Sequence, residues 1–438
     1  MSIQTDREEQ AAAHMHGICL KTGPPRRVGV ELEWLVRDAR DPALPVTAER
    51  ITAAVSGFGG TLFGGTALDT VPGTLPSGAL LTAEPGGQLE LSSLPADSLG
   101  DCVSATLADM AALRSAVASA GLELAGYGLD PLRPPHRVLN QPRYAAMEAF
   151  FDRDGPWGRR MMCGTASVQV CLDAGDDSDG FTGYRHRWRL VHALGPVLVA
   201  AFANSPLREG RPTAWRSSRQ QVWANMDPSR TRPPLDASDP RDAWAAYALD
   251  AKVMLVRDPA SSNWAAPPGV TLRTWVRGAS EVPGFIGTLR QPTDEDLAYH
   301  LSTLFPPVRP RGHLELRMID AQPGDGWIVP LAVTTALMHD EQAADRALAA
   351  TRALPVNGTD TRASGAVAGD QWLRAARLGP SDPTIARASR ECFAAAREAL
   401  DRMGVPARIT TAVDAFIEEY VEQDRCPADD LISREEPR

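Results

Sequence analysis

Glutamate residues recur in three short segments that are far apart in the chain and that alternate between apolar and polar side chains. The segments are VGVELEW (28–34), EPGGQLELS (84–92) and HLELRMID (313–320), and their glutamates are Glu31, Glu33, Glu84, Glu90 and Glu315. Alternate side chains of a strand point to the same face, so Glu31 and Glu33 would stand side by side. Like charges at such spacing repel by about 1 kcal/mol or more unless a cation lies between them. Oxygen ligands favour magnesium or manganese over zinc, and the pattern therefore predicts a divalent metal site.

A fourth segment, TASVQVCL (165–172), has the same alternation but carries amide and hydroxyl groups instead of carboxylates. Thr165, Ser167 and Gln169 alternate there with valine and leucine. If the four segments share one sheet, one face is a core surface and the other collects the polar groups. The polar face would then hold Glu31, Glu33, Glu90, Gln169, Glu315 and Arg317.

A simpler interpretation must be weighed against the metal site. A single glutamate on the polar face of an antiparallel strand is more often solvated than bound to a metal. Glutamate is also depleted in strands, yet here it recurs in three of them, and one lies beside the turn glycines Gly86 and Gly87. This recurrence favours the metal site.

The elements that must position these residues are helices mixed with separated strands. Residues 97–121 have helical spacing and end at Gly121, and residues 190–203 are predicted to form a buried helix. This arrangement indicates an α+β fold with an antiparallel sheet. Residues 1–25 are expected to be a flexible lead and residues 26–438 a single catalytic domain, mostly helical from about 325. A proline- and arginine-rich stretch, residues 129–144, is predicted to be a loop over the site.

Composition excludes several classes of protein. The formal net charge of −10 argues against a nucleic-acid or anionic-membrane partner, because either requires a basic face. The six cysteines include no Cys-x-x-Cys pair and the first residues form no apolar signal core, so a soluble cytoplasmic protein is expected. Of the 45 basic residues only Lys21 and Lys252 are lysines, and no P-loop is present. Phosphate chemistry would therefore depend on arginine and metal.

Several blocks of the sequence resemble a known family. They are GVELEW, EPGGQLELSS, MMCGTASVQVCLD, ANSP, RSSRQQVWANMDPSR and HLSTLFPPVRPRGHLELRMID, in this order between residues 28 and 323. The order of these blocks is similar to that in glutamate–cysteine ligases, above all the plant-like group and its actinobacterial branch, which makes γ-glutamylcysteine for ergothioneine.

The resemblance implies a glutamine synthetase-like fold, with a funnel-shaped site on a curved antiparallel sheet and helices packed on one face. The implied reaction uses ATP as a substrate: ATP phosphorylates the side-chain carboxylate of L-glutamate, and the amine of L-cysteine then displaces phosphate. Mg²⁺, or Mn²⁺, would bridge the phosphates. The oligomeric state is left open.

Roles for single residues follow from the same resemblance. Arg317 and Arg309 would steady the transferred phosphoryl group through the planar guanidinium fork. Substrate carboxylates would bind to Arg219 and Arg230, and Thr165 and Ser167 would donate hydrogen bonds. The implied metal ligands are Glu31, Glu33, Glu90, Glu315, Gln169 and Glu84.

Three alternatives stay open. The first is a ligase that joins L-glutamate to an amine other than L-cysteine, because nothing in the sequence identifies a thiol pocket. The second is a regulatory protein that binds a nucleotide or amino acid on a retained scaffold, although every expected carboxylate is present. The third is a metal-dependent phosphotransferase, which the substrate-side motifs do not support.

Overall fold

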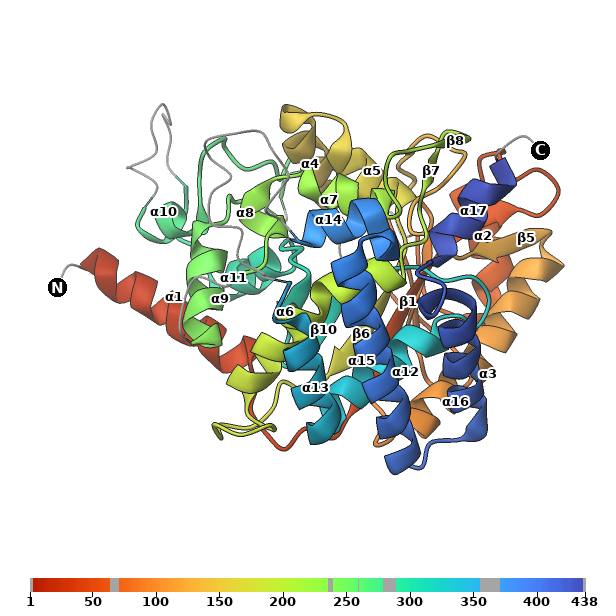
Figure 1. The fold of residues 1–438 in the computed structure, drawn as a ribbon. Coiled ribbons are helices and arrows are strands. Elements are labelled where there is room, and N and C mark those ends of the chain that lie inside the picture. The colour runs from red at the N-terminus through yellow and green to blue at the C-terminus, as the bar shows by residue number, and fades with distance from the viewer. Residues whose placement is uncertain are drawn as a thin grey trace.

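An eight-stranded antiparallel sheet forms the centre of the molecule (Figure 1). The computed structural model describes residues 3–63, 71–234, 239–258, 260–278, 289–354 and 371–435. The strand order is β2-β3-β4-β1-β6-β10-β9, and β5 pairs with the last residues of β1. The strands of this sheet are β1 (Val28–Asp38), β2 (Gly73–Thr74), β3 (Leu80–Ala83), β4 (Leu89–Ser92), β5 (Leu122–Ala125), β6 (Ser167–Leu172), β9 (Val308–Pro310) and β10 (Leu314–Asp320). A separate hairpin consists of β7 (Leu207–Arg208) and β8 (Arg211–Pro212).

Helices cover one face of this sheet. The helices α3 (Leu99–Ser119), α6 (Tyr184–Ala201) and α12 (Ile328–His339) contact the strands directly. Outside them lie α13 (Glu341–Thr351), α14 (Gln371–Leu378), α15 (Pro383–Arg402), α16 (Ala407–Phe416) and α17 (Pro427–Glu435). The valines and leucines of β1, β4, β6 and β10 form one buried core with these helices. The alternation read from the sequence thus does define a core face.

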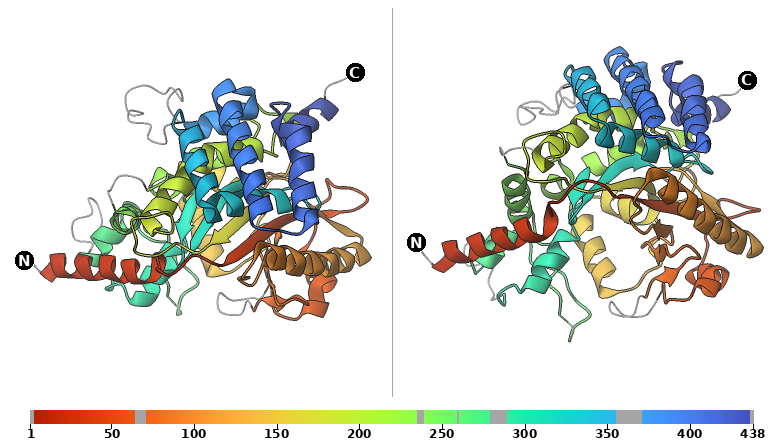
Figure 2. Two further views of the ribbon diagram at one scale, coloured as in Figure 1. Left: turned by 60° about the horizontal axis from the view of Figure 1, so that its bottom comes forward. Right: turned by 90° about the horizontal axis from the view of Figure 1, so that it is seen from below.

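Other segments surround the opposite face of the sheet. Figure 2 shows α4, drawn in yellow, and the orange-red segment around α2 on the side away from the blue C-terminal helices. The elements outside the helical layer include α2 (Ala48–Val55), α4 (Pro142–Phe151), α5 (Trp157–Gly164), α7 (Ser218–Ala224), α8 (Pro228–Thr231) and α11 (Asp294–Leu301). Short elements such as α2 and α4 therefore flank the sheet on the side away from the C-terminal helices.

The N-terminal segment differs from its prediction. Residues Ile3–Cys19 form helix α1, which packs on α9 (Pro240–Asp250) and α10 (Leu272–Val276) instead of being a flexible lead. Met15 is fully buried in a second core, and Glu8 forms ion pairs with Arg273 and Arg277. Apolar burial and ion pairing together hold this helix in place.

The other local predictions agree with the structure. Helix α3 begins after the N-cap Ser98, and Gly121 follows its end with a φ of +68°, a conformation that favours glycine. Helix α6 is almost entirely buried, as predicted for residues 190–203. The stretch 129–144 is irregular up to Gln141, after which α4 begins.

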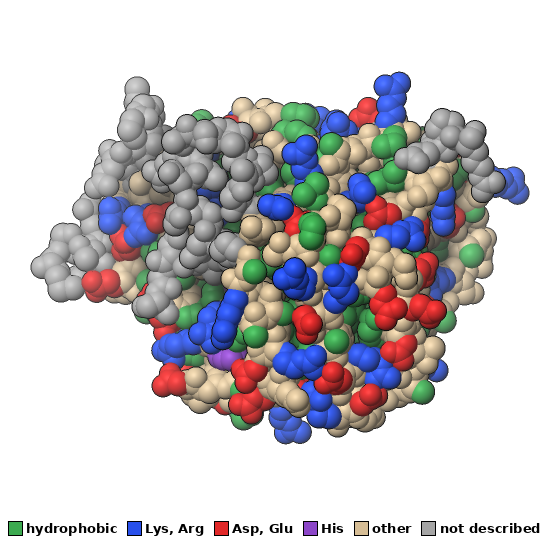
Figure 3. Space-filling model, viewed as in Figure 1, with side chains coloured by type: hydrophobic (Ala, Val, Ile, Leu, Met, Phe, Trp, Pro, Cys, Tyr) green, Lys and Arg blue, Asp and Glu red, His purple; other side chains and the backbone are tan. Residues whose placement is uncertain are grey.

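One face of the molecule and the described helices bear on the expectations about charge and membrane spans. Figure 3 shows acidic and basic side chains interspersed over the face formed by the C-terminal helices. None of the described helices combines the length and apolar character that a bilayer crossing requires. All six cysteines are free thiols.

Candidate active site

Strand register brings the predicted polar residues onto one face of the sheet. Glu33 of β1 pairs with Glu90 of β4, and Glu31 pairs with Gln169 of β6. Glu315 of β10 pairs with Cys171 of β6. Residues that pair directly across two strands point to the same side, so these side chains share a face as the sequence predicted.

Glu84 reaches the same face from the turn between β3 and β4. The amide of Gly87 donates to the carbonyl of Glu84 at 2.8 Å, and the amide of Val138 donates to Pro85 at 2.7 Å. A Cβ atom on Gly86 would lie 2.3 Å from the carbonyl oxygen of Cys163, so only glycine fits. The turn is thus held between the loop before α4 and the end of α5.

Three of the glutamates form no ion pair with a basic side chain among the described residues, and nearby arginines offset their charge only in part. Burial, followed by the nearby charge of Glu315, raises the pKa of Glu31 to about 7. Burial and the charge of Glu33 raise the pKa of Glu84 to about 7, and burial with the charge of Glu31 raises the pKa of Glu90 well above its usual range. Each of the three side chains keeps partial solvent exposure. An excess of recessed carboxylates is the electrostatic setting that a bound cation relieves.

Glu315 stands apart from the other carboxylates because arginines enclose it. Arg309 donates Nε to Glu315 Oε2 at 2.5 Å and Nη2 to Oε1 at 3.1 Å. Arg317 Nη1 lies 3.2 Å from Oε2, and Arg311 Nη1 lies 3.5 Å from Oε1. Burial acts to raise the pKa of Glu315, but Arg309 and Arg317 outweigh it and hold that pKa well below its usual range. Arginines thus contact both oxygens of Glu315, and its metal role stays a prediction.

Two of the predicted residues orient Glu33. Ser167 Oγ donates to Glu33 Oε2 and Gln169 Nε2 donates to Glu33 Oε1, both at 2.9 Å. The other end of the Gln169 amide accepts a hydrogen bond from Arg317 Nη1. The amide oxygen of Gln169, which would be the metal ligand, thus already accepts a hydrogen bond from Arg317. The hydroxyl of Ser167 already donates its proton to Glu33.

Thr165 and Arg230 have structural contacts where substrate binding was predicted. Thr165 Oγ1 donates to the carbonyl of Met161 at 2.6 Å and closes helix α5. Arg230 is fully buried and donates to Asp227 Oδ2 at 3.1 Å and to the carbonyl of Thr303 at 2.9 Å. These donors have partners within the protein, and the substrate-binding roles of Thr165 and Arg230 stay predictions.

Arg219 retains unused donors. Its Nη2 donates to the carbonyl of Arg317 at 2.8 Å, and its guanidinium stacks 4.5 Å from the ring centroid of Trp223. The side chain is 1% exposed, and neither its Nε nor its Nη1 has a hydrogen-bond partner in the described part of the chain. Asp320 is an ion-pair partner of Nη1 at 3.9 Å. Buried donors without acceptors are costly, which fits a site for an anionic group.

Sequence reasoning missed two residues of helix α4. The guanidinium of Arg143 lies 4.8 Å from the ring centroid of Tyr299 and donates to Ser302 Oγ at 3.1 Å. Burial, followed by the charge of Glu84, raises the pKa of the Tyr144 hydroxyl. Both residues end the stretch that was predicted to lie over the site. The only signal was their place in that stretch, which does not tell which side chains point inward.

A metal ion would have to be bound partly by groups outside the protein. Within the described ranges, no three His, Cys, Asp or Glu side chains form a ready-made cage. Mg²⁺ is commonly held by one or two carboxylates together with water and substrate phosphates, so an open carboxylate face suits it.

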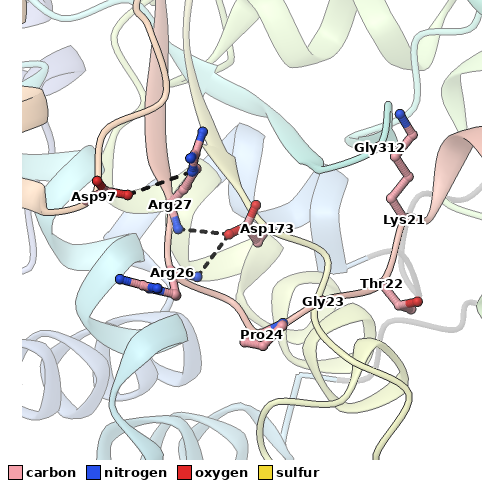
Figure 4. A pocket seen from close by; sticks show the side chains of 9 residues that line it. All are labelled: Lys21, Thr22, Gly23, Pro24, Arg26, Arg27, Asp97, Asp173 and Gly312. Carbon is pink, nitrogen blue, oxygen red and sulfur yellow. Dashed lines mark hydrogen bonds and ion pairs between the residues drawn. The ribbon is translucent and has the colours of Figure 1, made fainter.

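A pocket of about 240 Å³ lies apart from this face, where the chain enters β1 (Figure 4). The amides of Arg26 and Arg27 donate to Asp173 Oδ2 at 2.9 and 2.8 Å. The side chains of Lys21 and Arg26 point in different directions, as the figure shows. The pocket therefore has no converging cationic groups.

Comparisons with known proteins agree with the geometry. The chain is 39% identical to the glutamate–cysteine ligase EgtA of Mycolicibacterium smegmatis, over 99% of this chain and 92% of that protein. It is 29% identical to the chloroplastic glutamate–cysteine ligase of Medicago truncatula, over 64% of this chain and 54% of that protein.

The fold is shared with a solved structure. A glutamate–cysteine ligase from Francisella tularensis, in complex with AMP, superposes with a TM-score of 0.52 at 10% identity, covering 94% of this chain and 85% of that one. This likeness confirms the glutamine synthetase-like α+β class expected from the sequence. The family model described as glutamate-cysteine ligase family 2 matches residues 27–438, and the chain belongs to that family.

Proposed function

We propose that the protein joins the γ-carboxylate of L-glutamate to the amine of L-cysteine in an ATP- and magnesium-dependent reaction through γ-glutamyl phosphate. The product, γ-glutamylcysteine, would serve ergothioneine synthesis, as the likeness to EgtA implies. The observation that carries the proposal is the single sheet face on which carboxylates with raised pKa values lie beside a cluster of arginines. The first group suits a divalent cation, and the second suits phosphate.

The carboxylates Glu31, Glu33, Glu84 and Glu90 would hold magnesium. When bound, the ion neutralises charge on the ATP phosphates and on the transferred group. The chain contributes the alignment of these ligands: Ser167 and Gln169 fix both oxygens of Glu33, and the constrained glycine turn fixes Glu84. Fixed ligands need no reorganisation during the reaction.

The arginines would bind and align the reacting groups. Arg317 and Arg309 would contact the phosphoryl group while it moves from ATP to the L-glutamate side chain, and Glu315 keeps them assembled. Arg219 would direct its Nε, which has no hydrogen-bond partner among the described residues, to a substrate carboxylate. Holding both substrates in line supplies most of what such a transfer requires.

Cysteine residues of the protein have no covalent role in this scheme. Cys171 lies on the carboxylate face, but burial and the charge of Glu31 raise the pKa of its thiol well above the usual value. A protonated thiol is a poor nucleophile. L-Cysteine is the proposed acceptor, and the alternative is a ligase that uses another amine.

The test is ADP release from ATP in the presence of magnesium and L-glutamate, screened against a panel of amines with product identification by mass spectrometry. We expect release to require both magnesium and L-glutamate and to be fastest with L-cysteine. Equal product formation after chelator treatment would contradict the proposal. A clear preference for a different amine would move the assignment to the alternative ligase.

The Glu33→Gln variant tests the metal face itself. It should fold normally and lose most activity, because it removes one charge from the carboxylate set while keeping the side-chain shape. If the defect is metal affinity, added magnesium should restore part of the activity. Unchanged activity at low magnesium would refute the role of Glu33.

A further inference from the structure

Strand β10 contains a bulge at the position of Arg317. Leu316 pairs with Val170 and Ile319 pairs with Val168, so two residues of β10, Arg317 and Met318, stand opposite the single residue Gln169. A bulge bends its strand and changes the direction of the side chain that it carries. The Arg317 side chain here donates to Gln169 and lies against Glu315 on the carboxylate face.

Two side chains of helix α7 donate hydrogen bonds to the backbone carbonyls of the two bulged residues. Arg219 Nη2 donates to the carbonyl of Arg317, and Gln220 Nε2 donates to the carbonyl of Met318, each at 2.8 Å. Backbone carbonyls inside a sheet need partners, and these two bonds supply them at the bulge. The two donors are consecutive in sequence and match two consecutive acceptors.

Helix α7 is itself fixed to the end of the same strand. Its N-cap residue Ser217 accepts from the amide of Gln220 at 3.2 Å and donates to Asp320 Oδ1 at 2.9 Å. Asp320 is buried and also accepts from Ser205 Oγ at 2.7 Å. Helix α7 is therefore joined by hydrogen bonds to the bulge and to the end of β10. Gln220 contributes one of these bonds and forms no hydrogen bond with the carboxylates in the described part of the chain.

We propose that Gln220 is a positioning residue for phosphoryl transfer, which acts by holding the bulge that directs Arg317 onto the carboxylate face. This inference rests on the proposed function, because it assigns Gln220 an effect only through the phosphate role of Arg317. A positioning role for Gln220 differs from a general role in stability in its effect on kinetics. Loss of the Gln220 bond should change turnover and leave the binding of L-glutamate nearly unchanged.

The experiment compares Gln220→Met with Gln221→Met. Both changes keep side-chain length and helix propensity and remove an amide, but the Gln221 side chain makes no hydrogen bond among the described residues. We expect Gln220→Met to lower kcat by about 5- to 10-fold, which is the effect of losing one hydrogen bond that positions a catalytic group. The KM for L-glutamate should change by less than about twofold. Gln221→Met should stay within about twofold of the parent.

A double-mutant cycle with Arg317→Lys separates positioning from stability. If Gln220 acts through Arg317, adding Gln220→Met to Arg317→Lys should lower kcat by less than about twofold further. Full multiplication of the two effects, or equal losses in the Gln220 and Gln221 variants, would overturn the inference. If Gln220→Met does not fold, Gln220→Asn gives the same comparison, since its amide is one methylene too short to reach Met318. A parent protein without glutamate-dependent ADP release would instead overturn the proposed function.

Discussion

Replacing Arg317 by lysine is the most direct test of the arginine cluster. The Arg317 side chain is 11% exposed, lies 3.2 Å from Glu315 Oε2 and donates to Gln169. Lysine keeps the positive charge but has a single ammonium group, so it cannot present a planar fork to a phosphoryl group while it also keeps both of these contacts.

The size of the effect follows from the number of donors lost. One donor directed at charge that develops in the transition state contributes about 10²–10³ in kcat, or about 2.7–4 kcal/mol. We therefore expect kcat of Arg317→Lys to fall by about 10² or more, with a smaller change in KM for L-glutamate. Gln169 also loses a partner for its buried amide oxygen, which should lower the free energy of unfolding by about 1–3 kcal/mol.

Arg311→Lys is the matched control. Arg311 contacts the same carboxylate, Glu315, but its side chain is 53% exposed and its ion pair with Glu315 is 3.5 Å long. Exposed ion pairs contribute little, so this variant should stay within about twofold of the parent. The assay is steady-state ADP release at saturating ATP and magnesium. Activity of Arg317→Lys within a few-fold of the parent would refute the assignment of Arg317 to the phosphoryl group.

Three further predictions concern stability and the thiol on the site face. Burial lowers the pKa of His192 to about 4 and that of His300 to about 3, whereas both pKa values should be near 6.5 in the unfolded chain. The unfolded chain therefore binds more protons as the pH falls. Each histidine should lower the free energy of unfolding by about 2 kcal/mol between pH 7 and pH 5. Urea unfolding at the two pH values measures this loss, and His300→Gln should reduce it; equal stability at both pH values would contradict it. Gly86→Ala should lower the free energy of unfolding by about 1–3 kcal/mol and lower activity, because the new Cβ would lie 2.3 Å from a backbone carbonyl oxygen of α5. The control Gly57→Ala, whose Cβ would have no atom within 4 Å, should be neutral in thermal unfolding and activity assays. A Gly86→Ala variant as stable as the parent would show that the turn can shift. Cys171→Ser should keep activity within about threefold in the ADP assay, and complete loss with an unchanged circular dichroism spectrum would argue against the acyl-phosphate route.

The carboxylate face was predictable because its signal is local. A period of two in β1, β4, β6 and β10 assigns each side chain to one of two faces, and burial of the apolar face then fixes the other. The register that places Glu33 opposite Glu90 depends on pairing between distant segments, but any register that buries the same face produces the same grouping. Hence the residues of the carboxylate face could be predicted from the sequence, although the residues that pair with them across the strands could not.

The contacts that distinguish one polar residue from another could not be found in the same way. The enclosure of Glu315 by arginines and the burial of Arg230 depend on which chains meet in space. The docked helix α1 did have a local signal: Ala11, Met15 and Cys19 recur every four residues and are all buried. The Gly-Pro-Pro break after the helix marks its end but does not show whether it packs, which is why a loose lead was the wrong prediction.

The short strands at the ends of the sheet order affect how copies of the protein interact. β2 has two residues and β9 has three, the last of which is Pro310, a residue without an amide hydrogen. Long, regular outer strands act as templates for pairing between molecules, whereas brief ones that include proline do not. The terminal strands β2 and β9 thus offer little template for aggregation, and substitutions that extend them would be expected to reduce solubility before they affect catalysis.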